Sequence, residues 1–546
     1  MPTTRTVLLM TSASIATSTL AALVARDLSK TYGDRVVFDG VDVTANPGLP
    51  LGMVGENGVG KSTLMRLLAG AEPADTGTIT RPDDLVYLGQ EPDFGARASL
   101  GDVLDAALTP LHDAVRRLEE LAPHLMDESL HDEYAAVLAW AELHDAWDAD
   151  RRAEMAAARL GLDEIDRSRR VAAMSGGQRT RLALAAMITR RPACVLLDEP
   201  TNHLDDDAVS FLEDFLRDLP GIVVVASHDR TFLDNVCAVL MDLDPMHLGV
   251  DGEGGNRFTG GYTAYLAHKR ASRRRWEQAF LDQQDEMNQL RKAAATTARH
   301  VAHNRGPRDG DKFIYHFKGG NVARTISRRV RDAEKRIEVL ERDRVPKPTP
   351  ELRFTADLST RRASSRIHIR DLVVTGRVDV RRLDVAPGEH LLVSGSNGSG
   401  KSTLLKVLNG DLSATTGIAE VAAQRIGYLP QDVTFARPDT TPNEVYDAAT
   451  SSQRPLGDLG LIHPRELYRP VGVLSVGQQR RLALAILVAR QPDLLLLDEP
   501  TNHISLTLAE ELEEALQRSR STVVVASHDR WLRGRWEGSV LALPDR

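Results

Sequence analysis

The chain has little of what builds secreted, membrane or metal-cluster proteins. Its 546 residues include only two cysteines, Cys194 and Cys237, and neither stands in a metal-ligand spacing. This excludes an iron–sulfur or zinc module and is typical of a reducing cytosol, so we expect a cytoplasmic protein. No run of about twenty apolar residues occurs, so we expect no transmembrane helix. The nearest candidate, 7–24, is interrupted by six serines and threonines, and we interpret 1–24 as an N-terminal tail.

Charge is unevenly distributed along the chain, whose net charge is −9. Residues 269–344 carry 20 Lys+Arg against 11 Asp+Glu, whereas 111–166 carry 5 against 15. A basic segment in an acidic protein favours a polyanion partner at that segment, although a solvated helical surface would show the same excess. The acidic segment is a poor candidate for binding nucleic acid.

Four short motifs occur twice, in the same order. The first copies are GENGVGKS at 55–62, SGGQ at 175–178, DEPTNH at 198–203 and SHDR at 227–230. The second copies are GSNGSGKS at 395–402, SVGQ at 475–478, DEPTNH at 498–503 and SHDR at 527–530. Such a repeat indicates two related domains in a chain too long for a single core.

The first copy carries an insertion that the second lacks. Gln90 precedes Ser175 by 85 positions, whereas Gln431 precedes Ser475 by 44. Apolar residues in 111–147 recur at helical spacing and are interrupted by a proline-containing break. We therefore predict a helical arm, at about 100–165, inserted in the first domain.

The segment 262–345 joins the two copies. Residues recur every seven positions from Leu266 to Ala294, and steps of four and three alternate from Ile326 to Leu340. This pattern predicts coiled-coil-like helices, the first of them about 50 Å long. Glycines and a proline between the two halves predict an antiparallel pair with an irregular tip at about 300–322.

Each glycine-rich loop follows an apolar strand pattern and precedes a helix pattern, which is the setting of a P-loop. Glycines let backbone N–H groups surround phosphates, and Lys61 and Lys401 would contact the β- and γ-phosphates of ATP. The predicted ATP-binding residues of the first copy are Tyr32, Gly55, Glu56, Asn57, Gly58, Val59, Gly60, Lys61, Ser62, Thr63, Gln90, Ser175, Gly177 and Gln178. Those of the second copy are Gly395, Ser396, Asn397, Gly398, Ser399, Gly400, Lys401, Ser402, Thr403, Gln431, Ser475, Gly477 and Gln478.

Two acidic residues end a buried-strand pattern in each copy. Glu199 and Glu499 would act as general bases toward the attacking water. A histidine follows a further strand in each copy and would contact the γ-phosphate, which makes the predicted catalytic residues Glu199, His228, Glu499 and His528. Mg²⁺ is the expected metal cofactor, and its predicted ligands are Ser62, Gln90, Asp198, Ser402, Gln431 and Asp498.

Over about 25–245 and 365–540, these motifs resemble the ATP-binding cassette superfamily. The resemblance implies an α/β fold of two P-loop ATP-binding cassette domains. A long antiparallel α-helical linker would join them, with the helical arm inserted in the first cassette. We expect the tail at 1–24, the first cassette at 25–261, the linker at 262–345 and the second cassette at 346–546. Head-to-tail pairing would place the SGGQ and SVGQ motifs against the ATP of the opposite cassette.

Within the superfamily, the chain resembles the ABC-F family. The two EPTNH runs, the arm in the first cassette alone and the long linker carry this resemblance. It implies an ATP hydrolase that binds the tRNA exit site of the ribosome as a monomer, contacting large-subunit rRNA and peptidyl-tRNA. The predicted RNA-binding residues of the linker and its tip are Arg299, Arg308, Lys312, Phe313, Tyr315, His316, Phe317 and Lys318.

The extended tip favours the antibiotic-resistance group of that family. Only 10 of the 68 basic residues are lysines, which is typical of a high-GC genome such as that of an actinomycete. We therefore expect protection of the ribosome against macrolide, lincosamide or streptogramin-type drugs. The alternatives are a general ABC-F translation factor and the ATPase subunit of an importer that docks on a separate permease.

Three departures from the superfamily pattern distinguish the two cassettes. Val476 replaces the second residue of one signature, and Ser505 stands where the first copy has Asp205. Tyr32 is well placed to stack on adenine before the first P-loop, whereas 373–375 (Val-Val-Thr) offers no aromatic residue before the second. Since both glutamates and both histidines are present, we predict two competent but unequal ATP sites.

Overall fold

The computed structural model describes most of the chain. The described residues are 9–10, 21–33, 35–55, 58–90, 92, 94–95, 97–202, 204–243, 257–300, 328, 331–347, 365–396, 398–450, 454–501 and 506–544. At 9–10, 35, 294–300 and 506–507 it describes the backbone alone. Two compact units divide the chain. The first comprises Met1–Asp244, Arg257–Thr263 and Leu352–Arg546, and the second comprises Pro245–Asn256 and Ala264–Glu351.

The first cassette is built on a sheet with the strand order β1-β6-β7-β8-β4-β9-β10. Its strands are β1 (Leu9–Met10), β4 (Leu51–Val54), β6 (Leu85–Leu88), β7 (Cys194–Asp198), β8 (Ile222–Ala226), β9 (Val239–Asp242) and β10 (Arg257–Thr259). The strands from β6 to β9 are parallel, and the apolar runs of β7 and β8 are buried throughout, as central parallel strands require. Strand β1 pairs antiparallel with β6, so part of the predicted tail is a strand of this sheet.

A smaller antiparallel sheet, β3-β2-β5, completes the first cassette's α/β core. Its strands are β2 (Leu23–Tyr32), β3 (Arg35–Ala45) and β5 (Thr76–Thr80). Buried and exposed residues alternate along β2, so only one face of this sheet meets the core. Leu23 and Leu28 on that face belong to the same hydrophobic cluster as Leu64 and Met65.

Most helices of the first cassette begin at a motif. These are α1 (Lys61–Ala69), α5 (Gly176–Arg190), α6 (Asp206–Asp218) and α7 (Arg230–Val236). The P-loop, the DEPTNH motif and the SHDR motif each follow a parallel strand and precede a helix. The fold therefore gathers them at the carboxyl edge of the sheet, where α/β proteins bind ligands.

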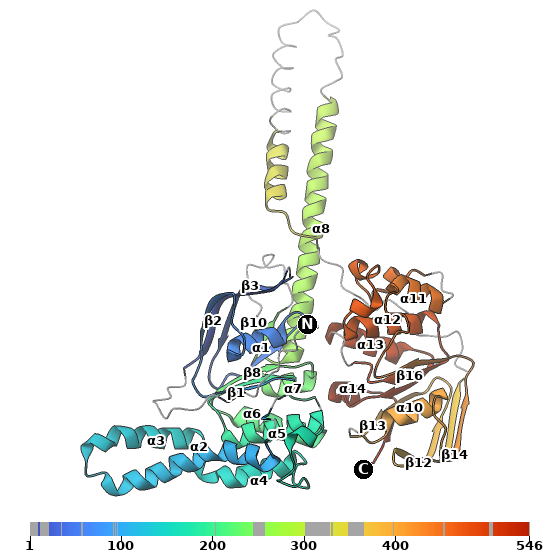
Figure 1. The fold of residues 1–546 in the computed structure, drawn as a ribbon. Coiled ribbons are helices and arrows are strands. Elements are labelled where there is room, and N and C mark those ends of the chain that lie inside the picture. Colours follow the sequence, from blue (N-terminus) through green and yellow to red (C-terminus); the bar gives the residue numbers. More distant parts are fainter. Residues whose placement is uncertain are drawn as a thin grey trace, which may run out of the picture. The chain divides into compact units, whose positions relative to one another are not determined.

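Three helices occupy the insertion of the first cassette. They are α2 (Leu100–Leu121), α3 (His131–Leu143) and α4 (Ala149–Arg159) (Figure 1). Leu111, Leu118, Val137 and Trp140 form a separate hydrophobic cluster between these helices. The helical arm expected from the apolar spacing is therefore present and has its own small core.

The second cassette repeats the plan without the insertion. Its parallel sheet has the order β15-β16-β17-β13-β18, and its antiparallel sheet has the order β12-β11-β14. The strands are β11 (Arg366–Val374), β12 (Val378–Val385), β13 (His390–Ser394), β14 (Thr416–Ala422), β15 (Ile426–Leu429), β16 (Leu494–Asp498), β17 (Thr522–Ala526) and β18 (Ser539–Ala542). The helices are α10 (Lys401–Asn409), α11 (Pro442–Ala449), α12 (Val476–Ala489), α13 (Leu506–Arg518) and α14 (Arg530–Gly534). Short 3-10 helices occur in both cassettes at Ala122–His124, Glu128–Leu130, Ala146–Asp148, Val171–Ala173, Leu456–Leu459, Pro464–Glu466 and Val471–Val473.

The second unit consists mainly of the linker. Helix α8 (Tyr262–His300) has 39 residues and is therefore about 58 Å long. Residues 331–342 are also helical, and Trp276 of α8 donates from Nε1 to the carbonyl of Pro346 at 3.0 Å. Arg336 forms an ion pair with Glu286 at 2.9 Å, so the two helices run antiparallel, as predicted. None of the described helices is long and apolar enough to cross a membrane.

Candidate nucleotide sites

The first P-loop is shaped by its glycines. Gly60 has a φ of 120°, and a Cβ at this position would lie 2.5 Å from Phe38. Helix α1 begins directly after it with no side-chain cap, so its first backbone N–H groups have no side-chain acceptor. Lys61 is buried and donates from Nζ to the carbonyl of Gly55 at 2.7 Å. An uncapped helix start and a buried ammonium fit the phosphates of a nucleotide.

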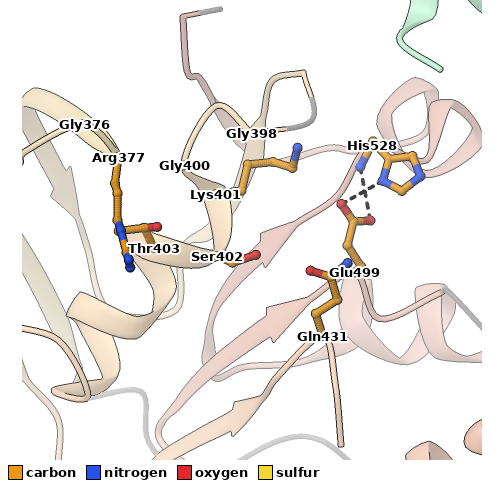
Figure 2. Close-up of a pocket in the computed structure, with 10 residues that line it drawn as sticks. All are labelled: Gly376, Arg377, Gly398, Gly400, Lys401, Ser402, Thr403, Gln431, Glu499 and His528. Atoms are coloured by element: carbon orange, nitrogen blue, oxygen red, sulfur yellow. Dashed lines mark hydrogen bonds and ion pairs between the residues drawn. The ribbon is translucent and has the colours of Figure 1, made fainter. Parts of the chain in front are cut away.

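The second P-loop has the same geometry. Lys401 donates from Nζ to the carbonyls of Gly395 and Ser396, at 2.8 and 3.0 Å. Burial lowers the pKa of Lys401. A pocket of about 310 Å³ lies over this loop, with Arg377 and Thr403 at one end and Glu499 and His528 at the other (Figure 2).

The two acidic residues of each copy lie at the carboxyl end of a buried strand. Glu199 and Glu499 have φ angles of 54° and 48°, a left-handed conformation that few residues other than glycine adopt. Their backbone N–H groups donate to Ala226 and Ala526, both at 2.8 Å. The same uncommon backbone turn therefore orients both glutamates.

Burial raises the pKa values of several of these carboxyls. It raises the pKa of Asp198 and of Asp498. Burial, with the negative charge of Asp198 beside it, raises the pKa of Glu199 to about 8. Shifted carboxyls at the edge of a parallel sheet are a feature of functional sites.

Each glutamate meets the histidine of its own cassette, but at different distances. Nδ1 of His528 lies 2.8 Å from Oε1 of Glu499, whereas Nε2 of His228 lies 3.5 Å from Oε1 of Glu199. Burial opposes the charged form of His528, but the hydrogen bond to Glu499 outweighs it and raises the pKa of His528. The predicted catalytic pairs are thus brought together in both cassettes and are not identical.

The carboxylates that precede the glutamates fit a hard cation. Oδ1 of Asp198 and both carboxylate oxygens of Asp498 are buried without a hydrogen-bond partner among the described residues. The hydroxyls of Ser62 and Ser402 adjoin them. In the first cassette, Gln90 donates from Nε2 to Oγ of Ser62 at 3.4 Å. The predicted Mg²⁺ ligands therefore converge, and oxygen donors of this kind suit Mg²⁺.

The two signature motifs form exposed helix starts. Ser175 and Gln178 form a capping box at the start of α5, and Ser475 and Gln478 repeat it at α12. Neither Ser175 nor Gly177 is among the described residues that line the pocket at the second P-loop. The structure thus does not bring this signature to the opposite P-loop, and the head-to-tail closure stays a prediction.

The two cassettes differ where an adenine is expected. Tyr32 is largely exposed, and its hydroxyl donates to Glu72 at 2.5 Å. In the second cassette, Gly376 and Arg377 lie in the turn between β11 and β12, and both line its pocket. Sequence reasoning missed Arg377 because it searched for an aromatic ring. A guanidinium plane can also stack on a base, and the Gly-Arg turn before the P-loop was the available signal.

Arg480 was also missed. It is almost completely buried, and its guanidinium donates to the carbonyls of Gln431 and Asp498, both at 2.6 Å. It therefore connects the start of α12 with two predicted Mg²⁺-binding positions. The offset of 300 places Thr180 at this position in the first cassette, so this connection belongs to the second site alone.

Several predicted residues lie outside the described part of the chain. In the two P-loops these are Glu56, Asn57 and Asn397. The tip residues Arg308, Lys312, Phe313, Tyr315, His316, Phe317 and Lys318, the side chain of Arg299, and Ser505 lie outside it as well.

Comparison with known proteins agrees with this geometry. The profile of the ABC transporter family matches residues 38–202 and 378–502. The archaeal ribosome recycling factor aABCE1, in complex with the ribosomal stalk protein aP1, has a similar fold. It is 19% identical with a TM-score of 0.54, and the match covers 94% of this chain and 87% of that one. A structure of RNase-L Inhibitor has a TM-score of 0.51 at 19% identity over 95% and 87% of the two chains.

The chain is also similar in sequence, over most of its length, to three further proteins. The Tylosin resistance ATP-binding protein TlrC of Streptomyces fradiae is 40% identical, over 96% of this chain and 98% of the relative. Probable ATP-binding protein YheS of Escherichia coli K12 is 32% identical, over 92% and 75%. The energy-dependent translational throttle protein EttA of Haemophilus influenzae is 30% identical, over 94% and 90%.

The fold and the two P-loop sites define a tandem ATP-binding cassette ATPase. The insertion in the first cassette, the linker and these relatives then place it more narrowly: the chain belongs to the ABC-F family of ATP-binding cassette proteins.

Proposed function

We propose that this ATPase protects the ribosome from drugs of the peptidyl-transferase centre and exit tunnel, of the macrolide, lincosamide or streptogramin type. The observation that carries the proposal is the 40% identity, over nearly the full length of both chains, to a tylosin resistance protein. The basic linker supports it, because rRNA and tRNA are polyanions. The protein would act as a cytoplasmic monomer in the ribosomal tRNA exit site, contacting large-subunit rRNA and peptidyl-tRNA.

In the proposed mechanism, Lys61 and Lys401 bind the β- and γ-phosphates of ATP, with the backbone N–H groups of the P-loops. Mg²⁺, when bound, neutralises phosphate charge, and its proposed ligands are Ser62, Gln90, Asp198, Ser402, Gln431 and Asp498. Glu199 and Glu499 orient and deprotonate the attacking water. Their left-handed backbone points each carboxylate toward the histidine that would contact the γ-phosphate.

The cycle would couple these sites to the linker. Binding of ATP would close each P-loop against the signature of the opposite cassette, with Ser175 and Gly177 on one and Ser475 and Gly477 on the other. The closed form would hold the linker in the ribosome, and hydrolysis would release it. A variant that binds ATP but cannot hydrolyse it should therefore accumulate on ribosomes.

Co-sedimentation tests ribosome binding. The doubly substituted Glu199→Gln, Glu499→Gln protein should pellet with ribosomes in ATP, and a Lys61→Ala, Lys401→Ala protein, which lacks the phosphate ligands, should not. Recovery of the glutamine variant only in the ribosome-free fraction would refute ribosome binding. It would favour the importer-subunit alternative.

Drug susceptibility separates resistance from general translation control. The 30% identity to EttA favours a general translation factor as the second candidate. A sensitive host that expresses the chain should gain resistance to a drug panel including tylosin. Deletion of the tip, 300–320, should abolish that gain. Unchanged susceptibility, with ribosome binding intact, would favour the translation factor.

A further inference from the structure

An ion pair connects the first cassette to the second site. Arg533 of α14 donates from one terminal nitrogen to Oδ1 of Asp206, at the start of α6, at 2.6 Å. The carboxyl side chain is 54% exposed, so this pair contributes little to stability. Nε of Arg533 is buried and has no partner among the described residues. The arginine therefore has an unused donor and a partner that it can exchange at little cost.

The pair lies in a cavity that reaches the second P-loop. This cavity has a volume of about 410 Å³, and its walls include Asp206, Arg533, Gly395, Ser396 and His528. Gly395 and Ser396 are the residues whose carbonyls bind the ammonium of Lys401. The charges of Arg533 and Asp206 both act on Lys401, the first lowering and the second raising its pKa, beneath the larger effect of burial. Arg533 thus stands beside the predicted phosphate ligands of the second site.

The first site has no equivalent of this pair. The offset of 300 places Leu233 at the position of Arg533, and Leu506 at the position of Asp206. Leu233 is fully buried in α7. Neither leucine can bind an anion, so whatever the pair does is confined to the second site.

The pair also differs from the other arginines of this interface. Arg230 pairs with Glu513 and Asp529, and Arg530 repeats this arrangement with Glu213 and Asp229. These matched pairs are more buried and follow the symmetry of the two cassettes. The matched pairs connect the two cassettes symmetrically. The Asp206–Arg533 pair has no symmetric counterpart, and it lies at a predicted phosphate site.

We propose that Arg533 is a phosphate-binding residue of the second ATP site, and that Asp206 of the first cassette holds it away until a phosphate replaces the carboxylate. A guanidinium can bind either a carboxylate or a phosphate through two parallel hydrogen bonds. A phosphate can therefore replace the carboxylate of Asp206 as the partner of Arg533. The phosphate is either the γ-phosphate of ATP or the inorganic phosphate released by hydrolysis. Through Asp206, the first cassette would thereby control the second ATP site, whereas the second cassette would have no such control over the first site. This inference rests on the proposed role of Glu199 and Glu499 as general bases.

The test isolates each site. A Glu199→Gln background leaves hydrolysis to the second site, and a Glu499→Gln background leaves it to the first. Arg533→Leu copies the residue of the first cassette, and Arg533→Lys keeps the charge. Arg518→Leu removes an exposed arginine of α13 that pairs with Glu514 and serves as the matched control. The measurements are kcat and KM for ATP, and inhibition by added inorganic phosphate.

In the Glu199→Gln background, Arg533→Leu should lower kcat/KM about tenfold, the effect of losing one charged hydrogen bond to phosphate. Arg533→Lys should restore part of it, and the control should not change it. Asp206→Leu should free the arginine and strengthen inhibition by inorganic phosphate. A loss carried mainly by KM for ATP identifies the γ-phosphate as the ligand, and a loss carried mainly by kcat together with altered phosphate inhibition identifies the released phosphate.

Equal losses in both backgrounds would overturn the proposal and assign Arg533 to the interface. Unchanged kinetics in the Glu199→Gln background would also overturn it. Failure of the proposed function is distinguishable, because it shows in a different measurement: the doubly substituted Glu199→Gln, Glu499→Gln protein would not pellet with ribosomes, whatever Arg533→Leu does to ATP hydrolysis.

Discussion

Nε2 of His144 lies 2.7 Å from Oδ2 of Asp84, and both side chains are buried. His144 follows α3 in the arm, whereas Asp84 precedes β6 of the main sheet. Arg190 donates to the other oxygen of Asp84 at 2.8 Å, and the backbone N–H of Ala193 donates to Oδ2 at 2.7 Å. One carboxylate therefore connects the acidic arm to the helix that follows the first signature and to the strand that ends at Asp198.

Replacement of Asp84 by alanine should destabilise the first cassette by about 3 kcal/mol, because it removes the buried carboxylate that Arg190 and His144 both contact. Denaturant unfolding at neutral pH measures the loss. Asp150→Ala is the matched control, because Asp150 also pairs with a histidine, His112, but at an exposed position. It should change stability by less than about 1 kcal/mol. Equal effects of the two substitutions would contradict the anchoring role.

The contribution of Asp84 should also depend on pH. Burial opposes its charged form, but His144 and Arg190 outweigh burial and hold the pKa below its ordinary value of 3.8. A carboxyl with a depressed folded-state pKa stabilises the protein above that ordinary value, and its contribution is lost as the pH falls toward the folded-state pKa. The difference in unfolding midpoint between the wild type and Asp84→Asn should therefore be constant at neutral pH and shrink below about pH 4. A difference that grows on acidification would contradict this.

The matched arginines predict energetic coupling between the cassettes. Arg230 is buried and contacts Glu513 and, at 3.1 Å, Asp529. Arg230→Met and Glu513→Gln should each cost about 3 kcal/mol, whereas the double variant should cost clearly less than their sum. A double-mutant cycle in urea measures this coupling. Additive losses would show that the two residues do not interact in solution.

The two proposed general bases, Glu199 and Glu499, should not be equivalent. His528 binds Glu499 closely and Arg480 holds the backbone beside it, whereas Glu199 has a longer contact with His228 and Thr180 at the position of Arg480. Glu199→Gln and Glu499→Gln should therefore reduce ATP hydrolysis to different extents. Steady-state ATPase assays of the two single variants measure this, and identical residual rates would count against unequal sites.

The features that the sequence predicted correctly are those formed by residues close together in the chain. The P-loops, the acidic pairs and the histidines follow strands directly, so a strand pattern and a motif suffice to place them at one edge of the sheet. The first linker helix, predicted to be about 50 Å long, is α8 (Tyr262–His300), and it could be predicted because its seven-residue spacing is continuous.

The missed features join residues that are distant in sequence. Asp84 meets His144 across 60 positions, and Asp206 meets Arg533 across 327. Charged residues are frequent in this chain, so nothing in its local pattern distinguishes a charge that pairs across the fold from one that faces solvent. A comparison of the two copies could have identified Arg533. At the common offset of 300, the first copy has Leu233 where the second has Arg533.

Gln283 makes three hydrogen bonds between α8 and the end of the second linker helix. Gln283 of α8 donates from Nε2 to the carbonyls of Leu340 and Asp343, at 3.3 and 3.0 Å. Its Oε1 accepts from the backbone N–H of Val345 at 2.8 Å. A leucine at 283 can make none of these bonds, which leaves three backbone groups without their partner at the point where the second helix ends.

Gln283→Leu should therefore loosen this end of the hairpin by about 2 kcal/mol, since each hydrogen bond contributes about 1 kcal/mol or less when partly exposed. Hydrogen exchange at Val345 should accelerate more than about tenfold. If the proposed function holds, the resistance that the chain confers should also fall, because the proposed mechanism needs a rigid linker to reach into the ribosome. Gln278→Leu is the control, because within the described part of the chain the side chain of Gln278 bonds to Asp282 of the same helix and to no residue of 331–347. Unaltered exchange at Val345 would contradict the role of Gln283. Faster exchange with full resistance would instead show that the ribosome itself holds the two helices together, so that rigidity in the free protein is not what protection requires.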